Sequence, residues 1–178
     1  NDPSLDVTAR LAAHGRAQQA AHHDLCGYVF KKNSPSFGVW RVKVYGARGS
    51  VQPGRGLYAA GFLEGAPWLP VEEEGRLGDP ALRDNFLERV FVTHRWQRLR
   101  AEGLTPARLI AFHTAHKLAL LAHSTTAYRA LGRRIAGAGR RGLAALAEAY
   151  FASLMQALAH PATPARHANV LEHLMGYL

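Results

Sequence analysis

The stretch that most constrains the fold is an alanine- and leucine-rich segment that starts at Thr105-Pro106 and continues without a helix breaker to Ser124. Threonine before proline is typical of a helix start, because the hydroxyl caps the first turn and proline fits the first helical position. The segment therefore predicts a long helix. His113, His116 and His123 fall on one face of it, because their spacings match whole helical turns.

The rest of the chain divides at Gly103-Leu104. Further helices are predicted after this point at 126–136, 141–158 and 164–178, each separated by a short polar or glycine-containing link. Before it, strands and helices alternate, with strands at 25–32, 39–45 and 69–73, helices at 6–21, 57–63 and 79–100, and a glycine-rich loop at 47–56. We expect an α+β protein, with a partial α/β domain at 1–103 that has a parallel component and an all-helical domain at 104–178. Because the chain begins with asparagine and ends on an uncapped apolar pattern, we expect residues to be missing at both ends.

Positive charge is concentrated in the second part of the chain. The net charge is +9, and residues 105–178 contain 8 Lys/Arg against 2 Asp/Glu, whereas residues 1–104 contain 14 against 11. Five arginines and no carboxylate lie between Thr126 and Arg141. This pattern is typical of a surface that attracts nucleic-acid phosphates, although a solvated face that keeps the protein soluble has the same composition. Charge alone therefore indicates a polyanionic partner at most, and no DNA specificity is expected.

Composition also excludes several classes. No run of eighteen apolar residues and no signal-peptide pattern is present, so no membrane partner is expected and a cytoplasmic location is favoured. The single cysteine, Cys26, excludes an internal disulfide framework.

Two groups of titratable residues leave alternatives open. His113 and His116 have a spacing that suits a metal, a structural role against neighbouring helices, or contact with an anion. Glu72, Glu73 and Glu74 follow a predicted strand, where a carboxylate is well placed for acid–base chemistry, but a solvated turn has the same sequence.

Several segments in order resemble a bacterial two-part family. They are KKNSPSFGVWRVKVYG from Lys31, LPVEEEGRLGDPALRDNFLERVFVTHRW from Leu69, FHTAHKLALLAHSTTAYRALGRR from Phe112, and HANVLEHLMGYL from His167. The first part resembles the thiouracil desulfidase family, an α/β domain that holds an iron–sulfur cluster, and the second resembles the YbgA-like helical domain. Their fusion resembles the tRNA 4-thiouridine desulfidases. The resemblance implies that the helical part binds tRNA and that the first part removes sulfur from a thiolated uridine.

The resemblance also implies roles for particular residues. Hydroxyls of Ser34 and Ser36 are the candidate catalytic groups. The candidate substrate-binding residues follow one strand or end another, and they are Lys31, Lys32, Asn33, Glu72 and Glu73. The candidate RNA-binding residues are the basic side chains of the helical part, namely His113, His116, Lys117, Arg129, Arg133, Arg134, Arg140 and Arg141.

The chain departs from this family at the cluster. Three cysteines ligate it in the desulfidases, one of them in a loop written SPSCG, whereas the loop here reads SPSFG with Phe37 at the ligand position. Cys26 matches none of the three ligands, and phenylalanine cannot coordinate iron. We therefore expect no metal site and no cofactor in this chain, and a desulfidase-type protein that is impaired. The alternatives are a non-catalytic RNA-binding module and an unrelated enzyme that uses Glu72–Glu74.

Overall fold

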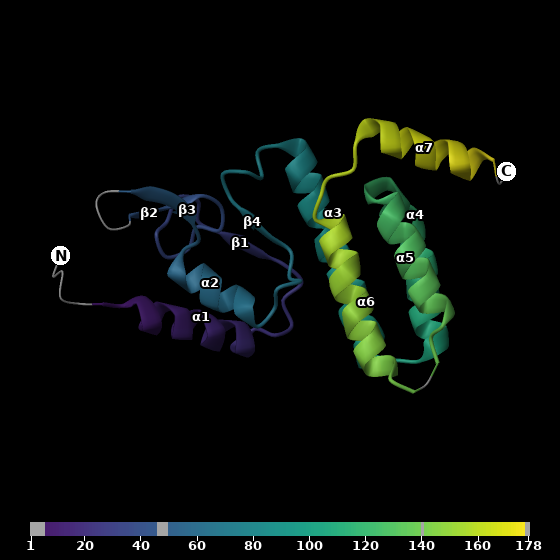
Figure 1. Cartoon of the computed structure of the whole chain (residues 1–178), viewed down its shortest axis with the longest axis horizontal. Helices are drawn as coiled ribbons and strands as arrows, with labels where there is room; N and C mark the ends of the chain where they lie inside the picture. The colour runs from purple at the N-terminus through teal and green to yellow at the C-terminus, as the bar shows by residue number, and fades with distance from the viewer. Residues whose placement is uncertain (1–5, 46–49, 140, 177–178) are drawn as a thin grey trace. The chain divides into compact units, whose positions relative to one another are not determined.

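The computed structural model describes residues 6–45, 50–139 and 141–176 and contains two compact units, residues 1–83 and 84–178 (Figure 1). The first unit mixes short strands with helices and the second is built from helices alone. The expected α+β class is confirmed, and helix is the dominant element.

The first unit carries two small sheets and two helices. Strands β1 and β4 pair in parallel, with Tyr28 opposite Val71, while β2 and β3 form an antiparallel pair. The expected parallel component is therefore present. In chain order the elements are α1 (Thr8–Ala21), β1 (Tyr28–Phe30), β2 (Val42–Tyr45), β3 (Val51–Gly54), α2 (Leu57–Glu64) and β4 (Val71–Glu73).

One predicted loop in this unit is a strand. Residues 51–54 of the glycine-rich segment form β3, so the expectation of a loop over 47–56 was wrong for these residues, while residues 46–49 lie outside the described part of the chain. Pro53 lacks an N–H and pairs opposite Lys43 of β2. Proline is tolerated in such a position when the strand is at an edge, and its presence beside glycine concealed the strand signal.

The core of the first unit is aromatic. Phe30 of β1 and Phe62 of α2 are almost fully buried, and their ring centroids lie 5.8 Å apart in an edge-on arrangement. Helices α1 and α2 cross at two glycines, because a Cβ on Gly61 would collide with the backbone of Ala12 and a Cβ on Gly15 with the carbonyl of Tyr58. The two backbones therefore approach more closely than side chains would allow.

Three helices of the second unit begin with a side-chain cap. Thr105 Oγ1 accepts a hydrogen bond from Arg108 N, Ser124 Oγ from Ala127 N, and Thr163 Oγ1 from Arg166 N. The helices are α3 (Pro80–Ala101), α4 (Pro106–His123), α5 (Thr125–Ala136), α6 (Leu143–Leu158) and α7 (Pro164–Met175). All four helices predicted after residue 104 are present, with small changes at their ends.

Trp96 of α3 lies at the centre of the second unit. Its ring stacks on Phe151 of α6 with centroids 4.6 Å apart and an interplanar angle of 2°, and it meets Phe112 of α4 edge-on at 5.3 Å. Asn85 at the other end of α3 donates to the carbonyl oxygen of Leu158 across 2.8 Å. Most of α3 thus packs with the helical unit, so the division between units falls at residues 83 and 84, whereas the sequence placed a boundary after residue 103.

None of the helices within the described ranges is both long enough and apolar enough to cross a membrane.

We predict that Gly61→Ala lowers the free energy of unfolding of the first unit by about 1–3 kcal/mol, because the added methyl forces α1 and α2 apart. Gly78→Ala is the matched control, since a Cβ there meets nothing within 4 Å. Urea denaturation of both variants measures the effect. Equal stability of the two variants would contradict the close crossing of α1 and α2.

Candidate functional site

The SPSFG segment of the first unit forms a tight turn held by its own side chain. Ser34 Oγ accepts hydrogen bonds from the backbone N–H groups of Ser36 and Phe37 at 3.3 and 3.1 Å, and the carbonyl oxygen of Ser34 accepts from Gly38 N at 2.8 Å. The Ser34 hydroxyl is thus part of the turn. Serine in such a turn bonds its own backbone, which explains why the segment folds locally.

The turn is seated on the first residues of α2. The carbonyl oxygen of Ser36 accepts from the backbone N–H groups of Tyr58 and Ala59 at 3.0 and 3.2 Å. Gly56 passes so close to Ser36 that a Cβ at this position would overlap its carbonyl group. The two candidate serines therefore lie beside the start of α2, in a backbone arrangement that requires a small residue at position 56.

Glu73 ties the segment after this turn to strand β4. The side chain is 1% exposed, and Oε1 accepts from the backbone N–H groups of Val39 and Trp40 at 2.8 and 3.0 Å. Hydrogen bonds to a charged acceptor are stronger than neutral ones, and these two lie in a buried setting. Glu73 therefore holds the segment that leads into β2.

Glu72 and Glu74 have different partners from Glu73. Glu72 is 4% exposed and accepts from Arg76 Nε at 2.6 Å and from the indole N–H of Trp40 at 3.2 Å. Glu74 is exposed, and its oxygens accept from Lys31 Nζ and from the backbone N–H of Lys32. These two bonds hold the pKa of the Glu74 carboxyl below its usual value. Each glutamate thus has hydrogen-bond partners in the first unit, and a proton-transfer role for these residues stays a prediction.

A cavity of about 470 Å³ lies beside these groups. Two of its lining residues, Asn33 and Arg41, have left-handed backbone conformations, with φ of 59° and 54°. Such conformations are costly for residues other than glycine and are often found at functional sites. The complete lining is Lys32, Asn33, Trp40, Arg41, Glu73 and Arg76.

The cavity brings together part of the predicted substrate site. Lys32, Asn33 and Glu73 line it, whereas Lys31 is paired with Glu74 and Glu72 with Arg76. The sequence did not point to the other cationic residues of the lining, Arg41 and Arg76. The Arg76 guanidinium lies 5.6 Å from the centroid of the Trp40 ring, close enough for a cation–π contact. No local pattern marks these residues, because the turn and strand ends that unite them are far apart in sequence.

The residues of this unit do not fit an iron–sulfur cluster. Phe37 is 41% exposed, and its ring centroid lies 4.8 Å from that of Tyr58, so the family's ligand position holds an aromatic contact. The chain has one cysteine, Cys26, and burial raises the pKa of its thiol, which disfavours the thiolate that binds iron. Within the described ranges, no group of three His, Cys, Asp or Glu side chains is arranged to hold a metal ion.

The three histidines of α4 occupy three different environments. His113 is half-buried and hydrogen-bonds through Nδ1 to the Tyr150 hydroxyl at 3.1 Å. His116 is 4% exposed, its Nδ1 donates to the carbonyl oxygen of Phe112 at 2.7 Å, and among the described residues its Nε2 has no partner. Burial lowers the pKa of both rings, so both are neutral near pH 7. Because these rings turn inward, we leave His113 and His116 out of any RNA-contacting surface.

His123 is the charged member of the three. Nδ1 donates to the carbonyl oxygen of His160 at 2.6 Å, and Nε2 donates to Glu88 Oε2 at 2.9 Å. Both ring nitrogens face acceptors, so the ring carries two protons. Burial alone would lower the pKa of His123, but the hydrogen bonds to Glu88 and His160 outweigh it and raise the pKa.

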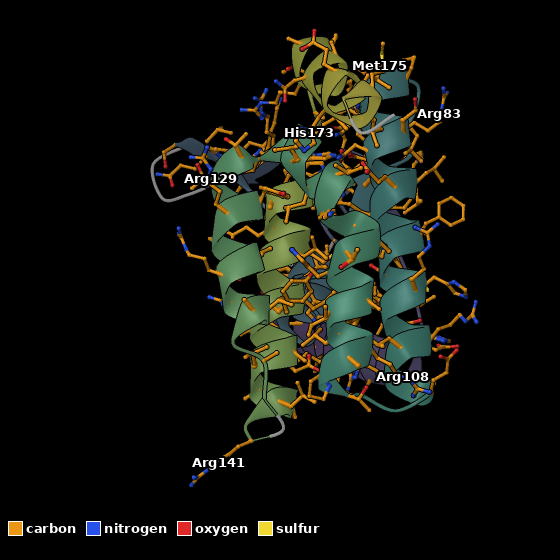
Figure 2. All side chains as sticks on the ribbon, turned by 90° about the vertical axis from the view of Figure 1, so that its right-hand side faces the viewer. Arg83, Arg108, Arg129, Arg141, His173 and Met175 are labelled. Carbon is orange, nitrogen blue, oxygen red and sulfur yellow. The ribbon has the colours of Figure 1, made fainter. Side chains whose placement is uncertain are left out.

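The predicted basic residues divide into exposed and anchored groups. Lys117, Arg129, Arg133 and Arg141 are exposed, and the Arg141 side chain points away from the helices at the link between α5 and α6 (Figure 2). Arg134 instead donates to the carbonyl oxygen of Ala149 and to Ser153 Oγ on α6. Arg140 lies outside the described residues.

We predict that Glu73→Ala lowers the free energy of unfolding by about 3 kcal/mol or more, because two buried N–H groups are deprived of a charged acceptor. Glu73→Gln keeps an oxygen at the same place and is expected to cost less. Glu74→Ala is the exposed control, and urea unfolding followed by circular dichroism measures the effect. Equal losses for Glu73→Ala and Glu74→Ala would contradict the proposed role of Glu73.

We predict that the stability contributed by the Glu88–His123 pair decreases as pH rises. The pKa of His123 is higher in the folded than in the unfolded chain. The stabilisation from the pair is therefore fully present below the unfolded pKa of His123, about 6.5, and is lost as pH rises through the folded pKa. The difference in unfolding free energy between the native chain and Glu88→Gln is therefore expected to be larger at pH 5.5 than at pH 9. A difference that stays constant or grows with pH would show that His123 is neutral.

Comparison with known proteins relates the helical unit to a family without an assigned function. Residues 117–178 match the family described as "Protein of unknown function (DUF1722)". The chain is also 39% identical over 95 residues to the "Uncharacterized protein YbgA" of Escherichia coli (strain K12), a match that covers 53% of this chain and 56% of the E. coli protein. The chain thus spans about half the length of this curated relative, and no solved structure matches. Residues 117–178 of the helical unit thus match the DUF1722 family, and part of the chain is YbgA-like.

Proposed function

We propose that this chain is an RNA-binding protein of the tRNA thiouridine desulfidase type. In this proposal the helical unit binds the phosphates of tRNA, and the cavity of the first unit receives a uridine base. The observation that carries the proposal is the exposed, unneutralised set of Arg129, Arg133 and Arg141 around α5. A tRNA partner implies a cytoplasmic protein.

The charge balance of the helical unit supports this surface. Residues 105–178 contain two carboxylates, Glu148 and Glu172, and Glu148 lies 3.4 Å from Arg100 of α3. Among the described residues no carboxylate pairs with Arg129, Arg133 or Arg141. Guanidinium groups left without a protein partner are suited to bidentate contact with phosphate oxygens. Such contacts position an RNA without reading its sequence, so the shape of the tRNA supplies selectivity.

The cavity of the first unit has groups suited to a single base. Asn33 offers an amide with both donor and acceptor atoms, as the edge of uracil requires, and Trp40 offers a ring that is 41% exposed for stacking. Lys32 and Arg41 supply positive charge for the adjoining phosphates, whereas Arg76 is paired with Glu72. A volume of about 470 Å³ is within the range of small-molecule sites, so a base turned out of the RNA has room.

Sulfur removal from a thiolated uridine is the second candidate function. The turn from Ser34 to Gly38, seated on α2 next to the base cavity, is the observation that favours it. In the family that the turn resembles, an iron–sulfur cluster supplies the chemistry. Because Phe37 and a single cysteine do not fit that cluster, we derive no reaction step and expect sulfur removal to be impaired.

We predict that Arg129→Ala/Arg133→Ala weakens binding of bulk tRNA and makes it less dependent on salt. Removing one phosphate contact, on a single strand or a duplex, reduces the slope of log K against log salt concentration by about 0.7–0.9. Fluorescence anisotropy over a series of salt concentrations measures this slope.

The matched control is Arg98→Ala/Arg100→Ala, which removes the same charge from α3. Both arginines already lie 3.4 Å from a carboxylate, Glu102 and Glu148 respectively. We expect this control to keep nearly the native slope. The α5 surface would be excluded as the RNA site by equal slopes for the two double variants.

A further inference from the structure

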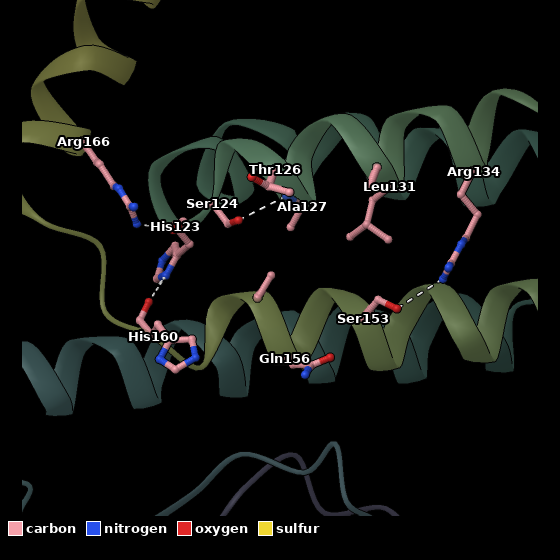
Figure 3. A pocket seen from close by; sticks show the side chains of 12 residues that line it. His123, Ser124, Thr126, Ala127, Leu131, Arg134, Ser153, Gln156, His160 and Arg166 are labelled. Carbon is pink, nitrogen blue, oxygen red and sulfur yellow. Dashed lines mark hydrogen bonds between the residues drawn. The ribbon is translucent and has the colours of Figure 1, made fainter.

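The helical unit contains a second cavity, of about 580 Å³, that the proposed RNA surface does not use (Figure 3). Its walls come from the end of α4, from α5 and α6, and from the residues leading into and starting α7. Arg166 and His160 lie at one end, and Arg134 and Ser153 lie at the other (Figure 3). All of its lining residues fall within residues 117–178, which match the DUF1722 family.

Both arginines of this cavity are held in place through one nitrogen. Arg166 Nη1 donates to the carbonyl oxygen of His123 at 2.5 Å. Arg134 Nη1 donates to the carbonyl oxygen of Ala149 at 3.1 Å and to Ser153 Oγ at 3.2 Å. A guanidinium carries five N–H donors, so most donors of each group remain for a ligand. The fixed orientation reduces the conformational entropy that a ligand would have to remove on binding.

The positive charge of the cavity lining favours an anionic ligand. No aspartate or glutamate is among its lining residues. Ser124 and Thr126 line it near the start of α5, where the partial positive charge of a helix N-terminus adds to that of Arg166. An oxyanion at this end lies near the Arg166 guanidinium and the start of α5, where the Ser124 hydroxyl, whose oxygen caps Ala127 N, keeps a proton to donate.

The middle of the cavity is mostly apolar, with the side chain of Gln156 as its polar member (Figure 3). Ala127, Ala130, Leu131 and Ala157 line it between the two polar ends. A volume of about 580 Å³ is larger than a bare phosphate needs and lies within the range of small-molecule sites. The arrangement therefore suits an anionic head attached to a compact, partly apolar body.

We propose that this cavity binds a phosphate monoester, with the phosphate at the Arg166 end and the organic body along the alanine and leucine residues of α5 and α6. The proposal does not rest on the RNA surface of α5. Two kinds of ligand carry such a group, a free nucleotide and an RNA with a terminal phosphate. The cavity would bind the phosphate of either one through the same contacts.

Titration of the full chain with AMP, followed by amide chemical shifts, tests the proposal. We expect saturable shifts at Thr126, Ala127 and Ser153, and much weaker ones with adenosine, which lacks the phosphate. A short RNA with and without a 5′-phosphate separates the two sources. Preference for the phosphorylated RNA over AMP assigns an RNA end, and the reverse assigns a free nucleotide.

Two variants locate the binding. Arg166→Gln is expected to weaken AMP binding about tenfold or more, since it removes a charge-assisted hydrogen bond. Because Arg166 also holds the His123 carbonyl, Ala130→Leu serves as a second variant that fills the cavity from an exposed position and leaves that bond intact. Arg98→Gln, which removes an exposed arginine outside the cavity, is the control.

The proposal is overturned if AMP gives no saturable shifts at millimolar concentration, if adenosine binds equally well, or if Ala130→Leu binds AMP as the native chain does. Failure of the RNA surface has a different signature: the salt dependence of tRNA binding would be the same in Arg129→Ala/Arg133→Ala as in Arg98→Ala/Arg100→Ala, while AMP binding would stay intact.

Discussion

The stack of Trp96 on Phe151 fixes which faces of the helical unit are inside. Trp96 is 1% exposed and contacts residues of α4 and α6, so α3, α4 and α6 all turn their aromatic residues toward it. That orientation carries His113 and His116 of α4 inward, where burial lowers the pKa of both rings and keeps them neutral. The permanent positive charge of α5 remains outside, on Arg129 and Arg133. The neutral rings of His113 and His116 thus lie inside the unit, whereas the guanidinium groups of Arg129 and Arg133 lie outside it.

In the first unit the equivalent constraint is Glu73. A buried carboxylate needs hydrogen-bond donors, and Glu73, which is 1% exposed, accepts two backbone N–H groups at the entrance to β2. The bond to Trp40 holds this residue at the rim of the cavity, next to Arg41 with its left-handed backbone. The glutamate thus positions part of the cavity wall, to which Lys32 and Arg41 add positive charge.

Sequence reasoning predicted most of what depends on local signals. The caps at Thr105 and Ser124 produce helices where expected, because a hydroxyl and its acceptor site lie within one turn. Strand β3 was missed because Pro53 and Gly54 resemble a loop unless the partner strand is known. The sequence also could not predict the different environments of His116 and His123, because both rings lie on one face of one helix, although one is neutral and the other charged. Arg166 was missed as a ligand-facing residue, because its contact with His123 joins positions 43 residues apart.

The central claim is that the helical unit binds RNA through its uncompensated arginines, and binding of bulk tRNA to the native chain at two salt concentrations tests it most directly. We expect the native chain to bind tRNA tightly at low salt and much more weakly as salt rises, because each phosphate contact releases a condensed counterion. Absence of binding at low salt, or binding that salt does not affect, would contradict it and leave the arginines of α5 as a solvated face.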